Sequence, residues 1–359
     1  RPLGVRMRPH APGKAKSRVE QRCSARSVSA MFHKNPATMN LDLPTPVTPW
    51  PLPGAGAELW IKRDDHTSPV YGGNKARKLG PLLAEARARG ASRLLTVGAL
   101  GSHHVLATAL FGRAAGFAVE AVMVPQPLTA HAARNFRAAL AAGLTVHAAA
   151  SWPGAALALL RERRGAFFIT VGGSNATGSR PYVAAAHELA AQVRSGVCPE
   201  PDAIVVTVGS GGTAAGLAVG LVEAGLTSVV HGIVVATPAG VVEQKTARLV
   251  ASLGAPEVAA AAVRRILFDR RYLGGGYGYA TPWGARARML ALRAGLGVDT
   301  TYTAKSLAAA LDLAADRRYR HVLYWHTLSA APLDLTHAPS PEECGVRYPA
   351  LFRGAWPEV

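Results

Sequence analysis

The sequence predicts an α/β fold made of two doubly wound parallel-sheet domains, with a ligand cleft between them. From about residue 58 onward, short β-rich runs alternate with longer alanine-rich segments of helical pattern, and such alternation indicates βαβ units. The run at 204–208 is apolar without alternation, which is typical of a strand covered on both faces. The alternating region is too long for one small sheet, so we expect two sheets and a cleft at the carboxyl ends of their strands.

Each expected strand is a short run of β-branched and other apolar residues bounded by turn residues. The expected strands lie at residues 58–62, 93–97, 119–124, 145–148, 167–171, 203–208, 229–235 and 321–325. Alanine-rich runs between them predict helices near residues 75–90, 103–116, 129–142, 154–164, 180–196, 212–225, 241–254, 282–295 and 304–317. We assign residues 39–74 and 171–359 to a larger domain and residues 75–170 to a smaller one.

The first 38 residues are rich in arginine and lysine and contain one acid, Glu20. We expect residues 1–38 to be a disordered basic leader. No apolar stretch follows, so the leader is not a secretory signal. An organellar transit peptide, a flexible tail, and sequence upstream of a true start at Met31 or Met39 all remain open.

Charge and cysteine content narrow the classes of function. The formal net charge is +18, but the arginines are scattered through helical segments with few aromatic residues between them, so we do not expect nucleic-acid binding. A basic surface that attracts an anionic cofactor and substrate is the simpler interpretation. Cys23, Cys198 and Cys344 form no CxxC pair, which favours a reducing, cytoplasmic location and argues against a zinc or disulfide framework. The sequence contains no run of eighteen apolar residues, so we expect no membrane span.

The sequence KRDDHTSPVYGGNKARKL at 62–79 places a lysine at the start of a helix. Asn74 is a good N-cap, so Lys75 is expected in the first turn. The positive end of the helix dipole disfavours a charged amine there, and a neutral lysine can form a Schiff base with an aldehyde. Lys78, about one turn later, could hold an anion. An ordinary surface lysine fits the same spacing.

The sequence VGSGGTAAGL at 208–217 follows an apolar strand and opens a helix. Its glycines let backbone N–H groups converge at the helix N-terminus, which is a favourable place for a phosphate. Ser210 and Thr213 add hydroxyl donors. The segment lacks the Gly-Lys-Ser/Thr ending of a nucleotide-binding P-loop. A glycine-rich turn that only allows tight packing is the alternative.

Two further segments place polar residues just before an expected helix. Ser102 in TVGALGSHH (96–104) could cap the next helix or face the cleft as a proton relay. His103 and His104 are adjacent, so they point in different directions on a helix and are not a two-histidine metal pair, and we expect no metal. Tyr302 in DTTYTAK (299–305) could be a general acid or base, or a packing residue with an exposed hydroxyl.

Taken together, these segments resemble the D-cysteine desulfhydrase and 1-aminocyclopropane-1-carboxylate (ACC) deaminase family of pyridoxal-phosphate enzymes, which share a tryptophan synthase β-like fold. The resemblance spans about residues 40–330. It rests on six motifs in the family's order, which are KRDD with YGGNKARKL, GGSN at 172–175, GSGGT at 209–213, GYG at 276–278, YTAK at 302–305 and WHT at 325–327.

The resemblance implies a role for each motif. Lys75 would carry the Schiff base with pyridoxal 5′-phosphate and shuttle the α-proton of a small amino-acid substrate. Lys78 and the loop formed by Ser210, Gly211, Gly212 and Thr213 would hold the phosphate. Ser102 would lie near the substrate carboxylate or act in catalysis, Tyr302 and Tyr277 would face the substrate, and Thr303 or Thr327 would approach the pyridine nitrogen. The relatives also suggest a homodimer.

The same resemblance implies an α,β-elimination of the D-cysteine type, which yields sulfide, pyruvate and ammonia. Thr303 matches the desulfhydrase branch, because the deaminase branch has Glu at this position. His103 stands where the family has an Asn beside the pyridoxal-phosphate ring, so the resemblance implies that His103 contacts the cofactor, by stacking on the ring or by bonding its phenolic oxygen. Leu328-Ser329 stands where the family has Gly-Gly. These departures leave open ACC ring opening, a β-replacement or racemase activity, and a catalytically silent binding protein on the same fold.

Overall fold

Two parallel sheets form the framework of the protein. The computed structural model describes residues 39, 41–52 and 54–352, so the predicted leader at 1–38 lies outside the described residues. One sheet has six strands in the order β1-β2-β10-β7-β8-β9, and the other has four in the order β5-β4-β3-β6. All strand pairs are parallel except β1 with β2. The predicted α/β fold with parallel sheets is therefore confirmed.

The strands lie close to the predicted runs. They are β1 (Val47–Trp50), β2 (Glu58–Arg63), β3 (Arg93–Ala99), β4 (Ala118–Val124), β5 (Thr145–Ala148), β6 (Phe167–Phe168), β7 (Ala203–Val208), β8 (Val229–Val234), β9 (Ile266–Asp269) and β10 (His321–His326). Sequence reasoning missed β1 and β9, which are four-residue edge strands. Such short runs lack the length that separates a strand from an irregular apolar segment.

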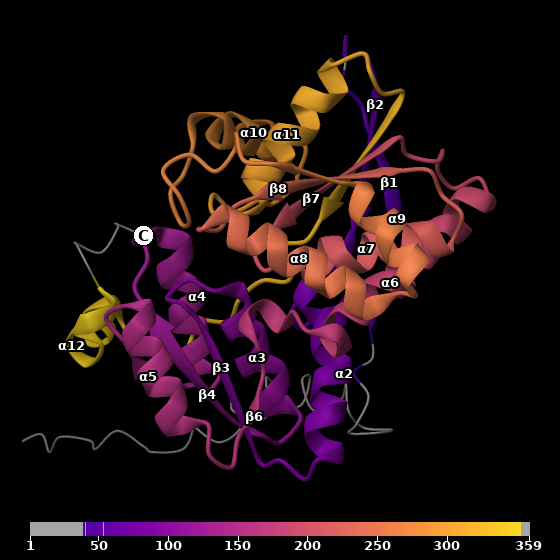
Figure 1. Cartoon of the computed structure of the whole chain (residues 1–359). Coiled ribbons are helices and arrows are strands. Elements are labelled where there is room, and N and C mark those ends of the chain that lie inside the picture. Colours follow the sequence, from indigo (N-terminus) through magenta and orange to yellow (C-terminus); the bar gives the residue numbers. More distant parts are fainter. Residues whose placement is uncertain (1–38, 40, 53, 353–359) are drawn as a thin grey trace, which may run out of the picture.

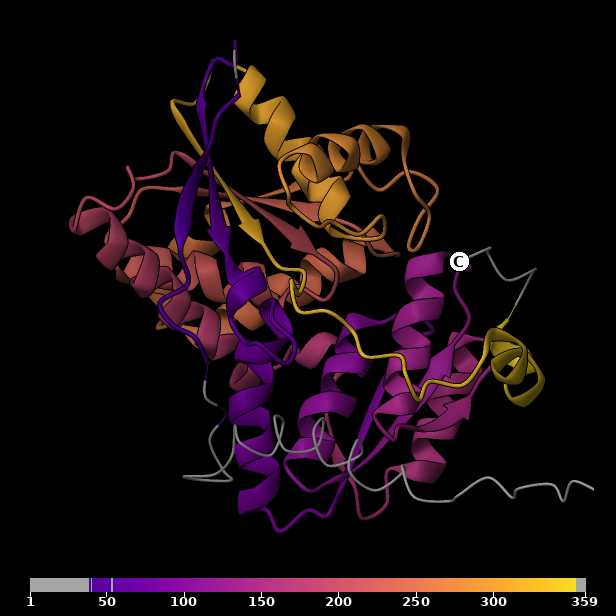
Figure 2. The same ribbon diagram turned by 180° about the vertical axis from the view of Figure 1, so that it is seen from behind.

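Helices cover both faces of each sheet (Figures 1 and 2). On the larger sheet, α6 (Ala176–Arg194), α7 (Gly212–Glu223), α8 (Ala239–Leu253) and α9 (Pro256–Arg264) pack on one face, and α10 (Pro282–Arg293) and α11 (Thr303–Ala315) on the other. On the smaller sheet, α2 (Asn74–Ala88), α3 (His103–Ala114) and α4 (Ala130–Ala141) lie opposite α5 (Trp152–Glu162). None of the helices in the described ranges is long and apolar enough to span a bilayer.

The end of the described chain corrects one predicted boundary. The larger domain was expected to extend to residue 359, but Leu333, Leu335, Cys344 and Leu351 join the core of the smaller sheet. This segment contains the short helix α12 (Pro341–Arg347) and runs across the back of the molecule in Figure 2. It carries too few apolar residues for its own core, so it packs on the exposed side of α4.

A buried charge network ties α2 to the larger sheet. The fully buried carboxylate of Asp64 accepts hydrogen bonds from Arg77 (2.8 Å), from the Tyr182 hydroxyl (2.7 Å) and from the Trp325 indole (2.8 Å). Burial alone would raise the pKa of Asp64, but Arg77 and these hydrogen bonds lower it. Arg77 lies on the helix that carries Lys75 and Lys78, so the network fixes both lysines relative to the larger sheet.

Candidate active site

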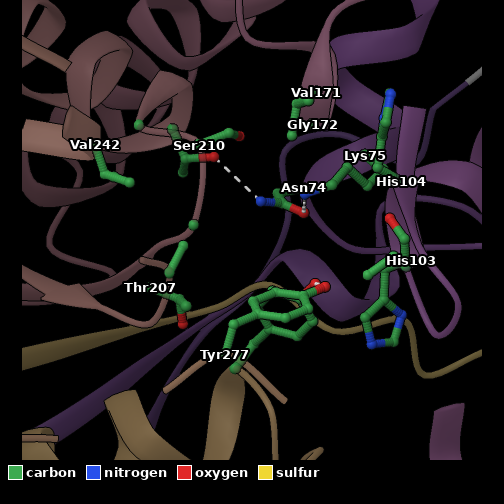
Figure 3. Close-up of a pocket in the computed structure, with 18 of the residues that line it drawn as sticks. Asn74, Lys75, His103, His104, Val171, Gly172, Thr207, Ser210, Val242 and Tyr277 are labelled. Carbon is green, nitrogen blue, oxygen red and sulfur yellow. Dashed lines mark hydrogen bonds between the residues drawn. The ribbon is translucent and has the colours of Figure 1, made fainter. Parts of the chain in front are cut away.

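A cavity of about 560 Å³ opens between the two sheets. It lies where strands β3, β7, β8 and β10 end, as expected for α/β proteins. All of the predicted site residues except Gly212 line this cavity. Figure 3 shows how Asn74, Ser210 and Tyr277 approach it from different elements.

Lys75 lies in the first turn of α2 and donates a hydrogen bond to Asn74 Oδ1 (2.8 Å). Burial lowers the pKa of the Lys75 amine to about 8, and the Asp299 carboxylate opposes part of this effect. A larger fraction of the amine is therefore neutral near neutral pH, as attack on an aldehyde requires. The prediction that Asn74 caps the helix is wrong, because Gly73 occupies the N-cap and the Asn74 side chain bonds Lys75 and Thr213 instead.

Two glycines before Lys75 let three backbone segments meet. A Cβ on Gly72 would lie 2.0 Å from the Asp65 carbonyl oxygen, and one on Gly73 would lie 2.3 Å from that of Thr327. Gly73 also has a positive φ of 81°, which favours glycine. The pair therefore places the start of α2 directly against the end of β10, where Thr327 lines the cavity.

A cradle for a phosphate lies at the N-terminus of α7. Gly211 has a φ of 88°, and a Cβ on Gly212 would lie 2.7 Å from Lys78 Nζ. Lys78 donates to Ser174 Oγ (2.9 Å), and Ser174 Oγ lies 2.7 Å from Ser210 Oγ. The glycines thus keep open the space in which backbone N–H groups, two hydroxyls and an ammonium converge.

The charge of this cradle also fits a phosphate. Lys78 is buried and has no carboxylate partner among the residues that the structure describes. Burial, together with Lys75 and Lys245, lowers the pKa of Lys78 well below its ordinary value. Lys245 on α8 lines the same cavity. A phosphate bound here would supply the negative charge that the surrounding side chains lack, so the site fits a phosphorylated aldehyde.

His103 lies at the start of α3 within a polar cluster. Its Nδ1 is 2.5 Å from the Tyr71 hydroxyl, and its Nε2 is 2.8 Å from His131 Nε2 and 4.0 Å from Asp299 Oδ2. Burial and the neighbouring His131 lower the pKa of His103 to about 3, so its ring is neutral. Ser102 caps α3 and also lines the cavity, so it is both the helix cap and the cleft residue that the sequence offered as alternatives. The His104 ring is hydrogen-bonded to Thr96 (2.8 Å), so it points in a different direction from His103, although both residues line the cavity.

Two tyrosines form a hydroxyl pair in the cavity wall. The Tyr277 and Tyr302 hydroxyls are hydrogen-bonded to each other. Burial raises the pKa of Tyr277 to about 12 and that of Tyr302 well above its ordinary value. Lys305 Nζ donates to the carbonyl oxygens of Leu273 and Gly276 and so fixes the loop that carries Tyr277.

Asp299 is the most important site residue that sequence reasoning missed. Its carboxylate accepts the Thr303 hydroxyl (2.6 Å) and the backbone N–H groups of Thr301 (2.9 Å) and Tyr302 (2.7 Å). Burial would raise the pKa of Asp299, but His103, His131 and these hydrogen bonds lower it. The Thr303 hydroxyl is therefore directed to Asp299, although Thr303 lines the cavity as predicted. An acid three residues before Tyr302, just ahead of a helix, was the available signal.

Comparisons with known proteins agree with this geometry. Residues 39–327 match the family described as pyridoxal-phosphate dependent enzyme. A nocardicin C-9′ epimerase from Nocardia uniformis subsp. tsuyamanensis is 35% identical over 306 residues, which are 80% of this chain and 91% of that protein. The crystal structure of an ACC deaminase homologue superposes with a TM-score of 0.69 at 29% identity, over 85% of this chain and 95% of that one.

A hydrogen sulfide-producing enzyme from Fusobacterium nucleatum shares the fold at 15% identity, with a TM-score of 0.58 over 80% of this chain and 93% of that one. The chain therefore belongs to the pyridoxal-phosphate dependent enzyme family, and it is similar in sequence and fold to the ACC deaminase homologue. The predicted family and cofactor are confirmed.

Proposed function

We propose that this pyridoxal-phosphate dependent enzyme removes the α-proton of a small amino acid and expels its β-substituent. D-Cysteine is the proposed substrate, and the overall reaction converts it with water to hydrogen sulfide, pyruvate and ammonia. Lys75, with its amine in the cavity and a pKa of about 8, is the proposed acceptor of the α-proton. When bound, pyridoxal phosphate withdraws the electron pair left at the α-carbon.

The observation that carries the proposal is the Tyr277–Tyr302 pair. Both hydroxyls are buried in the cavity wall with raised pKa values, so both remain protonated at neutral pH. Such a group is a good donor to a departing sulfur or nitrogen and a poor base. Reversible epimerisation by two facing groups needs the second group to act as a base in one direction, so this pair favours elimination.

Epimerisation is the second candidate, because the curated relative at 35% identity is an epimerase. It starts with the same removal of the α-proton and differs only in the fate of the electron pair. ACC ring opening is a third, because the superposed homologue is named for that deaminase activity. Its branch of the family has Glu where this chain has Thr303, which makes it the weakest of the three.

The test separates the shared step from the later ones. Holoenzyme is incubated with D-cysteine in deuterated water, and sulfide, pyruvate, L-cysteine and α-deuterium are measured. Elimination predicts stoichiometric sulfide and pyruvate. The variant Tyr302→Phe should lower sulfide release by about 10²- to 10⁴-fold, the usual worth of a general acid, while α-deuterium exchange persists. Exchange and L-cysteine without pyruvate would replace elimination by epimerisation. The absence of both α-deuterium exchange and pyruvate with D-cysteine and with β-chloroalanine would reject the proposal.

A further inference from the structure

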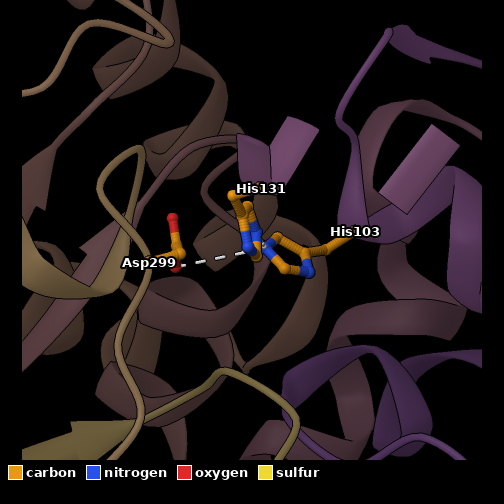
Figure 4. A group of neighbouring side chains, drawn as sticks. All are labelled: His103, His131 and Asp299. Atoms are coloured by element: carbon orange, nitrogen blue, oxygen red, sulfur yellow. Dashed lines mark hydrogen bonds and ion pairs between the residues drawn. The ribbon is translucent and has the colours of Figure 1, made fainter. Parts of the chain in front are cut away.

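His103, His131 and Asp299 converge from three separate elements on one point beside the cavity (Figure 4). His103 begins α3, His131 lies in the first turn of α4, and Asp299 precedes α11. One ligand atom from each lies within 4.8 Å of those of the other two. Residues separated by up to 196 positions therefore present two imidazole nitrogens and one carboxylate oxygen to a common centre.

Two of the three side chains, His103 and Asp299, are also held in place by other groups. The Tyr71 hydroxyl contacts Nδ1 of His103, which leaves Nε2 directed at the centre. Asp299 is fixed by the Thr303 hydroxyl and by backbone N–H groups, and it is fully inside the protein. Hydrogen bonds from neighbouring groups of this kind orient metal ligands in proteins.

A second observation concerns the charge and the polar atoms around this centre. Within the described ranges, the Asp299 carboxylate has no lysine or arginine within ion-pair distance, and the one basic side chain within 4.0 Å is His103. The Asn135 amide lies 3.3 Å from His131 Nε2, and its own Oδ1 atom is buried without a hydrogen-bond partner. A buried carboxylate that has no lysine or arginine partner among the described residues favours a cation at this centre.

We propose that His103, His131 and Asp299 bind a zinc ion. Two imidazoles and one carboxylate are a donor set typical of zinc, whereas magnesium and calcium take oxygen ligands. Arg134 and Arg288 act on His131 at longer range, and their positive charge weakens the attraction for any cation. An ion held mainly by nitrogen coordination tolerates this opposition better than one held by charge alone. Sequence reasoning excluded a metal because it considered only the adjacent pair His103 and His104.

Three protein ligands leave one coordination position open. His103 and Asp299 line the cavity, so an ion held by them would lie at the wall of the proposed substrate site. For the reaction we suggest, the zinc would bind the sulfur of the substrate and stabilise the thiolate as it leaves. This role rests on the proposed function, whereas binding of the ion itself does not.

The experiment measures zinc on the purified holoenzyme without relying on activity. Protein is depleted with a chelator and titrated with zinc against a chromogenic competitor, and cobalt-substituted protein is examined for the visible bands of tetrahedral Co²⁺. Wild type should bind about one equivalent per chain, and His131→Ala should lose it. Tyr71→Phe should weaken the affinity by about 10- to 100-fold. His147→Ala is the matched control, because His147 belongs to a comparable cluster with Glu120 and Glu162 in which Glu120 is already paired with Arg93.

The outcomes are distinct. Loss of the zinc and of the cobalt bands in His131→Ala but not in His147→Ala, with unchanged cofactor absorbance in both, supports the site. Equal zinc binding in wild type and His131→Ala, or no binding by wild type at micromolar zinc, overturns it. A protein that binds zinc at this centre but releases no sulfide would keep the metal site and reject only the function proposed above.

Discussion

The lowered pKa of Lys75 should control how fast the protein captures its cofactor. For a lysine of ordinary pKa, about 10.4, roughly 0.1% of the amine is neutral at pH 7.5. With the pKa at about 8, the neutral fraction at this pH is about 24%, which is roughly 200-fold more by the same titration relation. Because only the neutral amine attacks the aldehyde, the capture rate should rise about tenfold per pH unit up to about pH 8 and then level off.

The assay mixes apoprotein with pyridoxal phosphate in a stopped-flow instrument between pH 6 and 10 and follows the Schiff-base absorbance. Nα-Acetyl-lysine in the same buffers corrects for titration of the cofactor itself. Asp299→Asn removes the carboxylate that raises the pKa of Lys75, so its profile should shift to lower pH. A protein profile that parallels the free lysine and still rises at pH 10 would refute the claim that burial produces a reactive amine.

Three further predictions concern the elements around Lys75. Gly165→Ala places a side chain at positive φ in open space and should cost about 1–2 kcal/mol in urea unfolding. Gly73→Ala adds a clash with the Thr327 carbonyl oxygen to the same strain and should cost about 2–5 kcal/mol. Equal losses would contradict the packing argument. Lys78→Ala should raise the dissociation constant for pyridoxal phosphate about 10- to 100-fold in an absorbance titration. Lys245→Ala should raise it less. An unchanged dissociation constant in Lys78→Ala would show that Lys78 does not bind the phosphate. Asp64→Ala leaves Arg77 without its buried partner and should lower the free energy of unfolding by about 3–5 kcal/mol. Asp316→Ala at the exposed pair with Arg318 should lower it by at most about 1 kcal/mol. Equal losses in calorimetry would rule out a structural role for the buried network.

Much of the fold could be predicted from local pattern alone. The long helices and the buried strands carry periodic or continuous apolar runs, and these survive in any arrangement of the chain. The elements that were missed, β1, β9, α9 and α12, are short, and their signals do not rise above those of irregular segments. The packing of 333–352 on the smaller sheet depends on which apolar surface remains uncovered after the rest of the chain has folded, and local sequence does not contain that information.

The candidate site also has a part that local sequence predicts and a part that depends on tertiary contacts. The sequence by itself determined the positions of Lys75, of the glycines before it and of the phosphate loop. A turn that needs glycine and the start of the helix after it are both visible in a few consecutive residues. Only the tertiary structure decided that His131 and Asp299 meet His103, that Thr303 turns to Asp299, and that Lys78 lies unpaired beside Ser174. These contacts join residues far apart in the chain, so their geometry and their shifted pKa values arise from burial and distance, which exist only once the two sheets have closed around the cavity.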